Sequence, residues 1–303
     1  MKVIRAKVLG FCAGVRRAVE IALDISSKEY PSGSPVSGSP QAGRRVYTLG
    51  PLIHNSRVLG DLKERGVICL KEGELPVQDS IVIIRAHGVS PVFERDLVQR
   101  GITIIDATCP HVKVSQNKAR DFAQKAYRIF LAGEENHAEI DGIRGYAEDG
   151  FGASLSCFVA SNPLEAEAAA EELYRREPHA KVSLIGQTTI SAEEYWAVGE
   201  QIQRFFPSLE IVDSICGATA ERQKALRELC AGVDALIIVG SRESANTQRL
   251  LSLTRELGKP AWLAETPADI PAEIGTYKTV GISAGASTPD SLIKEVEQIL
   301  LFV

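Results

Sequence analysis

Several features that would define a class of protein are missing from this sequence. It contains no run of 18 apolar residues, so no membrane-spanning helix is expected. Its formal net charge is −5, whereas a surface that binds nucleic acid or an anionic membrane is basic. The opening stretch MKVIRAKVLGFCAGVRRAVE has early charges and no uninterrupted apolar core, so it is not expected to be a signal peptide. We therefore expect a cytoplasmic protein with neither a nucleic-acid nor a membrane partner.

The sequence also lacks paired cysteines. It has six cysteines but no C-x-x-C motif, which argues against zinc-ribbon, thioredoxin-like and ferredoxin-like proteins. In a cytosolic chain of this length, free thiols or metal ligands are expected rather than disulfides. The G-x-x-x-x-G-K phosphate loop is absent as well.

What the sequence does contain is a regular alternation of strands and helices. Short apolar runs such as ITIIDAT, KVSLIG and ALIIVG each lead through a polar or glycine turn into an amphipathic stretch. This pattern predicts an α/β fold with mostly parallel sheets, in which ligands bind beyond the carboxyl ends of the strands. The segment 31–45 is rich in proline, serine and glycine, and we expect it to be a flexible insertion.

One pattern occurs three times: an apolar strand, a cysteine, a small residue or proline, and then a helix. The three copies are VLGFCAGVRRAVEIAL with Cys12, IIDATCPHVKVSQNKA with Cys109 and IVDSICGATAERQKAL with Cys216. A spacing near one hundred residues indicates three similar α/β units, which we place at 1–100, 101–207 and 208–303.

Each unit also has two further strand ends that carry polar groups. One set of turns carries His54, then His137, then Ser244 and Asn246; the other carries His87, then Thr188 and Thr189, then Ser287. Three units around a pseudo-threefold axis, in a trefoil arrangement, would bring all of these strand ends together. The three thiols would then converge at helix N-termini, where the dipole favours a thiolate.

The residue types at these strand ends indicate their chemistry. Three thiolates without a fourth suggest an iron–sulfur cluster with one open iron, and a zinc site with three cysteines and a water is an alternative. Hydroxyls, amides, imidazoles and helix N-termini suit a phosphate. Glu139 lies two residues after His137 and is the natural proton donor if a substrate must lose a hydroxyl.

Simpler roles exist for the same residues. Serine, threonine and asparagine at a helix start are most often N-caps, and a single cysteine is more often a core thiol. The threefold recurrence favours a site for Cys12, Cys109 and Cys216. The other three cysteines do not share the pattern, and we expect core or helix packing for Cys69, Cys157 and Cys230.

Taken together, the motifs resemble the 4-hydroxy-3-methylbut-2-enyl diphosphate reductase family, which catalyses the last step of the methylerythritol phosphate route to isoprenoids. The resemblance covers nearly the whole chain. It rests on GFCAGVRRA, HNSRVLGDLKERG, RAHGVS, DATCPHV, NHAEIDGI, GQTTIS, DSICGAT, GSRESANTQRL and AGASTPDSLI, in the family's order.

The resemblance implies three α/β domains around a [4Fe–4S] cluster that is held by Cys12, Cys109 and Cys216, with one iron open. It implies a catalytic role for Glu139 and Thr188. It implies that an allylic diphosphate substrate is bound by His54, His87, His137, Thr189, Ser244, Ala245, Asn246 and Ser287. Two electrons would come from a ferredoxin or flavodoxin type partner, and the products would be isopentenyl and dimethylallyl diphosphate.

The sequence departs from the family pattern at a few places. Ala245 stands where many members have a second serine, Ala138 stands where proline is usual, and Glu134 and Glu135 make one turn acidic. We expect both glutamates to point into solvent. Two rival functions remain open here: a cluster-dependent dehydratase that needs no electron donor, and a non-catalytic iron–sulfur sensor.

Overall fold

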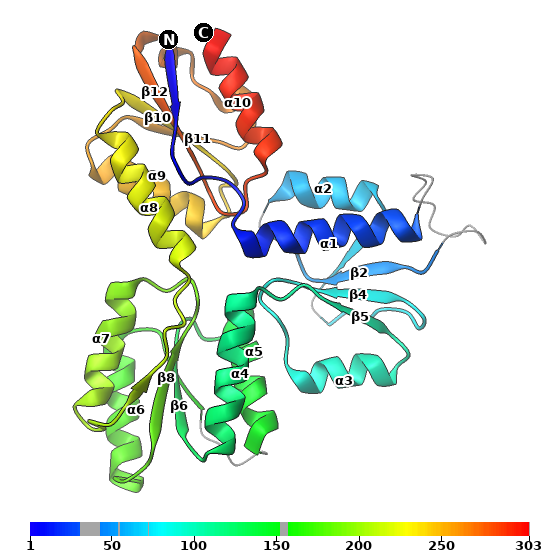
Figure 1. Ribbon diagram of the computed structural model, residues 1–303, viewed down its shortest axis with the longest axis vertical. Helices are drawn as coiled ribbons and strands as arrows, with labels where there is room; N and C mark the ends of the chain where they lie inside the picture. The colour runs from blue at the N-terminus through cyan, green and yellow to red at the C-terminus, as the bar shows by residue number, and fades with distance from the viewer. Residues whose placement is uncertain (31–42, 54, 72, 152–156, 303) are drawn as a thin grey trace. The chain divides into compact units, whose positions relative to one another are not determined.

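A computed structural model of the chain describes residues 1–30, 43–53, 55–71, 73–151 and 157–302 (Figure 1). The expected flexible insertion at 31–45 lies outside the described residues as far as residue 42. The chain has two compact units, one made of 1–71 and 217–303 and the other of 72–216.

The strands form three four-stranded sheets, which have the same internal order and are built from parallel strand pairs. The first sheet is β3 (Val67–Leu70), β2 (Val46–Leu49), β4 (Ile81–Ile84) and β5 (Thr103–Asp106). The second is β7 (Cys157–Ala160), β6 (Arg128–Ala132), β8 (Val182–Gly186) and β9 (Glu210–Ile211). The third is β11 (Ala261–Ala264), β10 (Ala235–Val239), β12 (Thr279–Ala284) and β1 (Lys2–Arg5). The repeat and the α/β class predicted from the sequence are confirmed.

Ten α-helices connect the strands in the described part of the chain. They are α1 (Ala13–Glu29), α2 (Ser56–Glu64), α3 (Pro91–Gln99), α4 (Pro110–Gln124), α5 (Ala138–Phe151), α6 (Pro163–Arg176), α7 (Ala192–Gln203), α8 (Gly217–Cys230), α9 (Ala245–Glu256) and α10 (Asp290–Phe302). Two short 3-10 helices, η1 (Pro267–Asp269) and η2 (Ala272–Thr276), lie between β11 and β12. The domain boundaries and the trefoil arrangement stay predictions.

One of the two edge strands of each sheet leads into a repeated cysteine. β1 pairs with β12, β5 pairs with β4, and β9 pairs with β8. In the third sheet this places the N-terminal strand beside a strand from the C-terminal part of the chain (Figure 1). The sheets are therefore completed by the segments that position the cysteines.

Polar caps fix where several helices begin. Asn55, Ser90 and Asn162 each accept a hydrogen bond from the backbone N–H three residues later, and proline follows Ser90 and Asn162 directly. Ser191 forms a capping box with Glu194. These local signals start each helix at the carboxyl end of its strand, which is where the predicted site residues lie.

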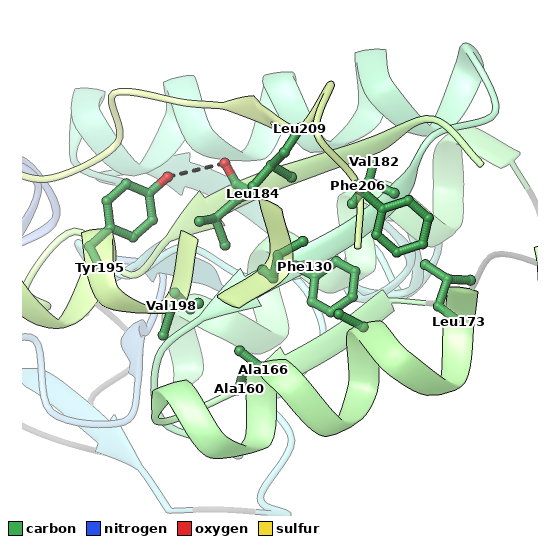
Figure 2. Packing of buried hydrophobic residues seen from close by; sticks show 13 residues of the cluster. Phe130, Ala160, Ala166, Leu173, Val182, Leu184, Tyr195, Val198, Phe206 and Leu209 are labelled. Atoms are coloured by element: carbon green, nitrogen blue, oxygen red, sulfur yellow. Dashed lines mark hydrogen bonds between the residues drawn. The ribbon is translucent and has the colours of Figure 1, made fainter. Parts of the chain in front are cut away.

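The second sheet is covered on both faces, and its side chains alternate accordingly. On one face, Phe130 and Leu184 pack with buried residues of α6 and α7. On the other, Ile129, Leu131 and Ile185 pack against α4 and α5. Figure 2 shows the first cluster, in which the Tyr195 hydroxyl donates to the Leu184 carbonyl at 3.1 Å.

The third sheet is built in the same way. Leu236 and Ile238 face buried residues of α8 and α9, whereas Ile237, Val280 and Ile282 face α10. Fully apolar central strands of this kind are typical of parallel sheets that are buried on both sides.

We expect Phe130→Ala to lower the free energy of unfolding by about 3–5 kcal/mol, because Phe130 is fully buried and its loss leaves a cavity. The ring stacks on Phe158 with centroids 4.9 Å apart, so that contact is lost as well. Denaturant unfolding measures the change. Leu164→Ala on α6 is the control, since Leu164 is 78% exposed, and an equal loss in both variants would contradict the assignment of this core.

Of the three cysteines outside the repeated pattern, one does not have the packing role that the sequence predicted. Cys230 is buried in the cluster between α8 and the third sheet, as predicted, and Cys157 is partly buried. Cys69 is exposed, so its predicted packing role is wrong. The reason is that β3 is an edge strand on which both middle residues are exposed.

Candidate functional site

The three repeated cysteines occupy equivalent places at helix starts. Cys12 and Cys109 are the N-caps of α1 and α4, and Cys216 directly precedes α8. The Cys12 Sγ accepts a hydrogen bond from the Val15 backbone N–H at 3.4 Å. All three are partly buried. A helix N-terminus and an N–H donor both favour a thiolate.

A backbone hydrogen bond ties each cysteine to the turn that follows the neighbouring strand of the same sheet. The amide of Cys12 donates to Ala286 O at 3.1 Å, that of Cys109 to Ala86 O at 2.9 Å, and that of Cys216 to Thr188 O at 2.8 Å. The three acceptors lie in the turns after β12, β4 and β8. These turns carry Ser287, His87 and Thr188, so each cysteine is held beside a predicted site residue.

Glu139 and Thr188 form a buried pair in the unit 72–216. The Glu139 side chain is only 1% exposed although it lies in the first turn of α5. Its Oε1 accepts the backbone N–H of Thr188 at 2.6 Å, and its Oε2 accepts the Thr188 hydroxyl at 3.0 Å. The two residues lie in different turns of the repeat, and the structure brings them together.

Burial raises the pKa of Glu139 to about 7, although the two hydrogen bonds from Thr188 act to lower it. Desolvation is the larger effect because water cannot stabilise the carboxylate at this depth. A carboxyl group that titrates near neutral pH can both hold and release a proton under cellular conditions. The geometry and the pKa therefore both support a proton-donor role.

The raised pKa also predicts a pH-dependent cost in stability. Below the ordinary value near 4.5 the carboxyl is neutral in both states. As pH rises to about 7 the unfolded chain releases the proton that the folded chain retains, so stability is lost. We expect Glu139→Gln to remove this loss and to be more stable than the wild type at pH 8, by on the order of 3 kcal/mol.

Denaturant unfolding at pH 5 and pH 8 measures this difference. The advantage of Glu139→Gln is expected to shrink strongly at pH 5. Glu134→Gln is the matched control, because Glu134 is exposed and lies on the preceding turn. A pH-independent difference between Glu139→Gln and the wild type would contradict a buried, titrating carboxyl.

Two of the predicted histidines lie near each other. The rings of His87 and His137 meet edge to face, with centroids 5.4 Å apart. The Nδ1 atom of His137 accepts the backbone N–H of Glu139 at 3.2 Å. This bond favours the tautomer with the proton on Nε2, which leaves an N–H donor at the far edge of the ring. Such a donor suits an anionic ligand.

The unit made of 1–71 and 217–303 holds a second group of predicted residues. Ser244 is the N-cap of α9, and its Oγ accepts the Ser287 hydroxyl at 3.5 Å. Both serines are buried, at 6% and 7% exposure. Asn246 follows in the first turn of α9 and accepts the Thr219 hydroxyl at 3.3 Å. Ser244 is thus an N-cap, as the simpler interpretation predicted, and it also lies beside Ser287.

The predictions for His54, for Thr189 and for the two glutamates Glu134 and Glu135 have different outcomes. His54 lies outside the described residues. Thr189 is exposed, and its hydroxyl accepts a hydrogen bond from the Gln187 amide at 2.9 Å. Glu134 and Glu135 are exposed, so their expected orientation toward solvent is confirmed. The roles assigned to the site residues stay predictions.

Gln187 is a neighbour of the site that the sequence analysis did not single out. It is 6% exposed, directly precedes Thr188, and its Oε1 accepts the Glu134 backbone N–H at 3.1 Å. It therefore links the turn after β8 to the turn after β6. The available signal was its place in GQTTIS, where a polar amide follows a fully buried strand.

The described residues contain neither a preformed metal-binding group nor a helix suited to crossing a membrane. No group of three or more His, Cys, Asp or Glu side chains there has the arrangement needed to hold a metal ion. Cys109 and Cys216 belong to one compact unit and Cys12 to the other. None of the described helices combines the length and the hydropathy that crossing a bilayer requires.

The fold and the site define an α/β protein of three repeated parallel sheets, with a cysteine at an equivalent helix start in each repeat. The sequence model of a family described as LytB protein matches residues 3–301. The chain therefore belongs to the LytB protein family, which confirms the resemblance found in its motifs.

Individual relatives agree with this membership. The chain is 39% identical to a 4-hydroxy-3-methylbut-2-enyl diphosphate reductase of Treponema denticola, over 99% of each chain. It is 35% identical to the reductase of the same name from Aquifex aeolicus, over 97% of this chain and 94% of the relative. A solved structure of (E)-4-hydroxy-3-methyl-but-2-enyl diphosphate reductase, described as the terminal enzyme of the non-mevalonate pathway, is 33% identical. It has a TM-score of 0.76 and full coverage of both chains.

Proposed function

We propose that this chain is a 4-hydroxy-3-methylbut-2-enyl diphosphate reductase, which acts in the last step of the methylerythritol phosphate pathway. In this reaction the allylic C–O bond breaks and the hydroxyl leaves as water. Two electrons and two protons are consumed, and the product is isopentenyl or dimethylallyl diphosphate. The observation that carries the proposal is the buried Glu139–Thr188 pair, held beside the amide of Cys216 in a chain of this family.

The three repeated cysteines fit an iron–sulfur group by their chemistry. They lie at helix N-termini, and Cys12 has an N–H donor to its sulfur. We assign Cys12, Cys109 and Cys216 as the ligands of a [4Fe–4S] cluster with one open iron. When bound, such a cluster supplies electrons and a Lewis-acid iron.

Glu139 provides the proton that lets the hydroxyl depart. Its carboxyl is shielded from water and titrates at about pH 7, so a large fraction carries a proton under neutral conditions. Thr188 holds both carboxyl oxygens through its backbone N–H and its hydroxyl. This fixes the direction of the acid, which general acid catalysis requires.

The diphosphate is bound by donors from both groups of turns. Ser244 and Ser287 supply hydroxyls, and the start of α9 at Ala245 and Asn246 supplies backbone N–H groups that lack an intrahelical acceptor. His87 and His137 supply imidazole donors, and His54 and Thr189 complete the predicted set. Ala245 has no hydroxyl to contribute, so its part is limited to its backbone N–H.

The electrons must come from outside the chain. Our proposal is a ferredoxin or flavodoxin type donor, which delivers them one at a time, and a cytoplasmic location. A dehydratase would turn over without a reductant, so omission of the reductant separates the two functions.

We expect Thr188→Val to move the pH dependence of kcat. The change removes the hydroxyl that lowers the pKa of Glu139 but keeps the backbone bonds to Glu139 and Cys216. The pKa of Glu139 then rises further, so the fall in kcat at high pH shifts to higher pH. A pH–rate profile measures the shift, and a shift to lower pH would contradict the hydrogen bond.

The test of the function is spectroscopic. The protein is purified without oxygen, and absorption and Mössbauer spectra are recorded before and after addition of 4-hydroxy-3-methylbut-2-enyl diphosphate. A [4Fe–4S] signal in which the substrate changes one iron, with turnover that requires a reductant, supports the proposal. Absence of a cluster after anaerobic reconstitution, or bound zinc alone, overturns it.

A further inference from the structure

A buried arginine donates hydrogen bonds to the backbone just before Cys12 and just after Cys216. Arg222 lies in α8 and is 4% exposed. Its Nη2 donates to Gly10 O at 2.6 Å, and its Nη1 donates to Ala218 O at 2.8 Å. Gly10 is two residues before Cys12, and Ala218 is two residues after Cys216. One guanidinium therefore joins the Cys12 turn to the first turn of the helix that follows Cys216.

The position of Arg222 on its helix is unusual. Arg222, Ala225, Leu226 and Leu229 follow the spacing of a single helix face, and the last three pack in the core beneath the third sheet. An aliphatic side chain at residue 222 would continue this apolar face at lower desolvation cost, because burying a guanidinium is expensive. The two charge-assisted hydrogen bonds provide a reason for an arginine here.

The Cys12 turn requires this kind of support. Gly10 has φ +74°, and a Cβ at this residue would come within 2.8 Å of Ile293 Cδ1. The backbone bond from Gly10 N to Ala284 O is long, at 3.4 Å, while Cys12 N is bound to Ala286 O at 3.1 Å. The bond from Arg222 fixes the carbonyl side of Gly10.

We propose that Arg222 is a positioning residue for Cys12. By bonding to Gly10 O and Ala218 O together, it sets the direction of the Cys12 sulfur relative to the start of α8. The inference rests on the proposed function, because it treats Cys12 as a ligand of an iron–sulfur cluster. If both hydrogen bonds of Arg222 are lost, we expect the protein to hold the cluster less tightly while the fold is retained.

Two variants separate positioning from charge. Arg222→Lys keeps the positive charge, but one ammonium group cannot replace the planar fork that reaches both carbonyls. Arg222→Met keeps an unbranched apolar stem and has no donor. Arg227→Met is the control, because Arg227 lies in the last turn of the same helix and is exposed.

The measurement is the rate at which an iron chelator removes iron from the anaerobically purified holoprotein. Thermal unfolding of each apoprotein is recorded in parallel. We expect iron to leave Arg222→Lys and Arg222→Met about 10–100-fold faster than the wild type, the size found for residues that orient metal ligands. Arg227→Met is expected to match the wild type, and the reduction potential is expected to shift in both Arg222 variants only.

Two results would overturn the inference. Iron release at the wild-type rate in both variants removes the positioning role. A normal rate in Arg222→Lys with a fast rate in Arg222→Met shows that charge alone matters. If Arg222→Met fails to fold, Arg222→Lys still decides the question. A wild-type protein without any cluster would instead reject the proposed function, so the two failures are distinct.

Discussion

Replacing Glu139 with glutamine is expected to lower kcat by about 10²–10⁴-fold, which is the usual contribution of a positioned general acid. Glutamine has nearly the same shape and keeps an oxygen that can accept the Thr188 N–H, so the site retains its geometry. It has no proton to give to the departing hydroxyl. The KM for the diphosphate is expected to change far less than kcat, because the diphosphate contacts lie on other residues.

Steady-state turnover under anaerobic conditions, with an artificial reductant in excess, measures this effect. The fall in kcat of the wild type above about pH 7 should also disappear in Glu139→Gln, since the group that titrates is gone. Glu134→Gln serves as the control. A Glu139→Gln enzyme with near-normal kcat would assign the proton to another donor.

Serine at any one of the three repeated cysteines is expected to abolish the iron–sulfur cluster and all turnover. A serine hydroxyl is a poor ligand for iron because it holds its proton at neutral pH, whereas a thiolate at a helix start is stabilised. Cys109→Ser is the first choice, because Cys109 makes no side-chain capping bond in α4 and its loss should leave the helix start intact. Iron and sulfide content and the visible absorption report the result.

Cys69→Ser is the matched control for these variants. Cys69 is exposed on β3 and lies outside the repeated pattern, so this variant should keep a full cluster and normal turnover. Full cluster content in Cys109→Ser, or equal loss in Cys69→Ser, would reject the ligand assignment.

The fold could be predicted from the sequence because one local pattern occurs three times. Apolar runs such as Ala235–Val239 are followed by polar turns and capped helices, and these features are encoded by neighbouring residues. The pairing of the edge strands could not be predicted in this way. Whether β5 joins β4, or β9 joins β8, is decided by packing between segments that no local pattern describes.

The candidate site could likewise be predicted only in part from the sequence. The positions of Glu139 and Thr188 at helix and strand ends follow from the sequence, but their mutual hydrogen bonds and the raised pKa depend on tertiary burial. Gln187 and Arg222 were not singled out for a related reason. Each acts through backbone groups that are remote in sequence, and such contacts leave no spacing signature.

The pairing of β1 with β12 has a consequence for synthesis of the chain. β1 emerges from the ribosome long before β12 exists, so the Cys12 turn has no Ala286 carbonyl to bind until translation is nearly complete. During that interval the Cys12 segment cannot reach its final position, whereas the Cys109 and Cys216 turns bind to turns that precede them in the chain. A chain that ends before β12 therefore lacks the backbone bond that holds the Cys12 turn in place.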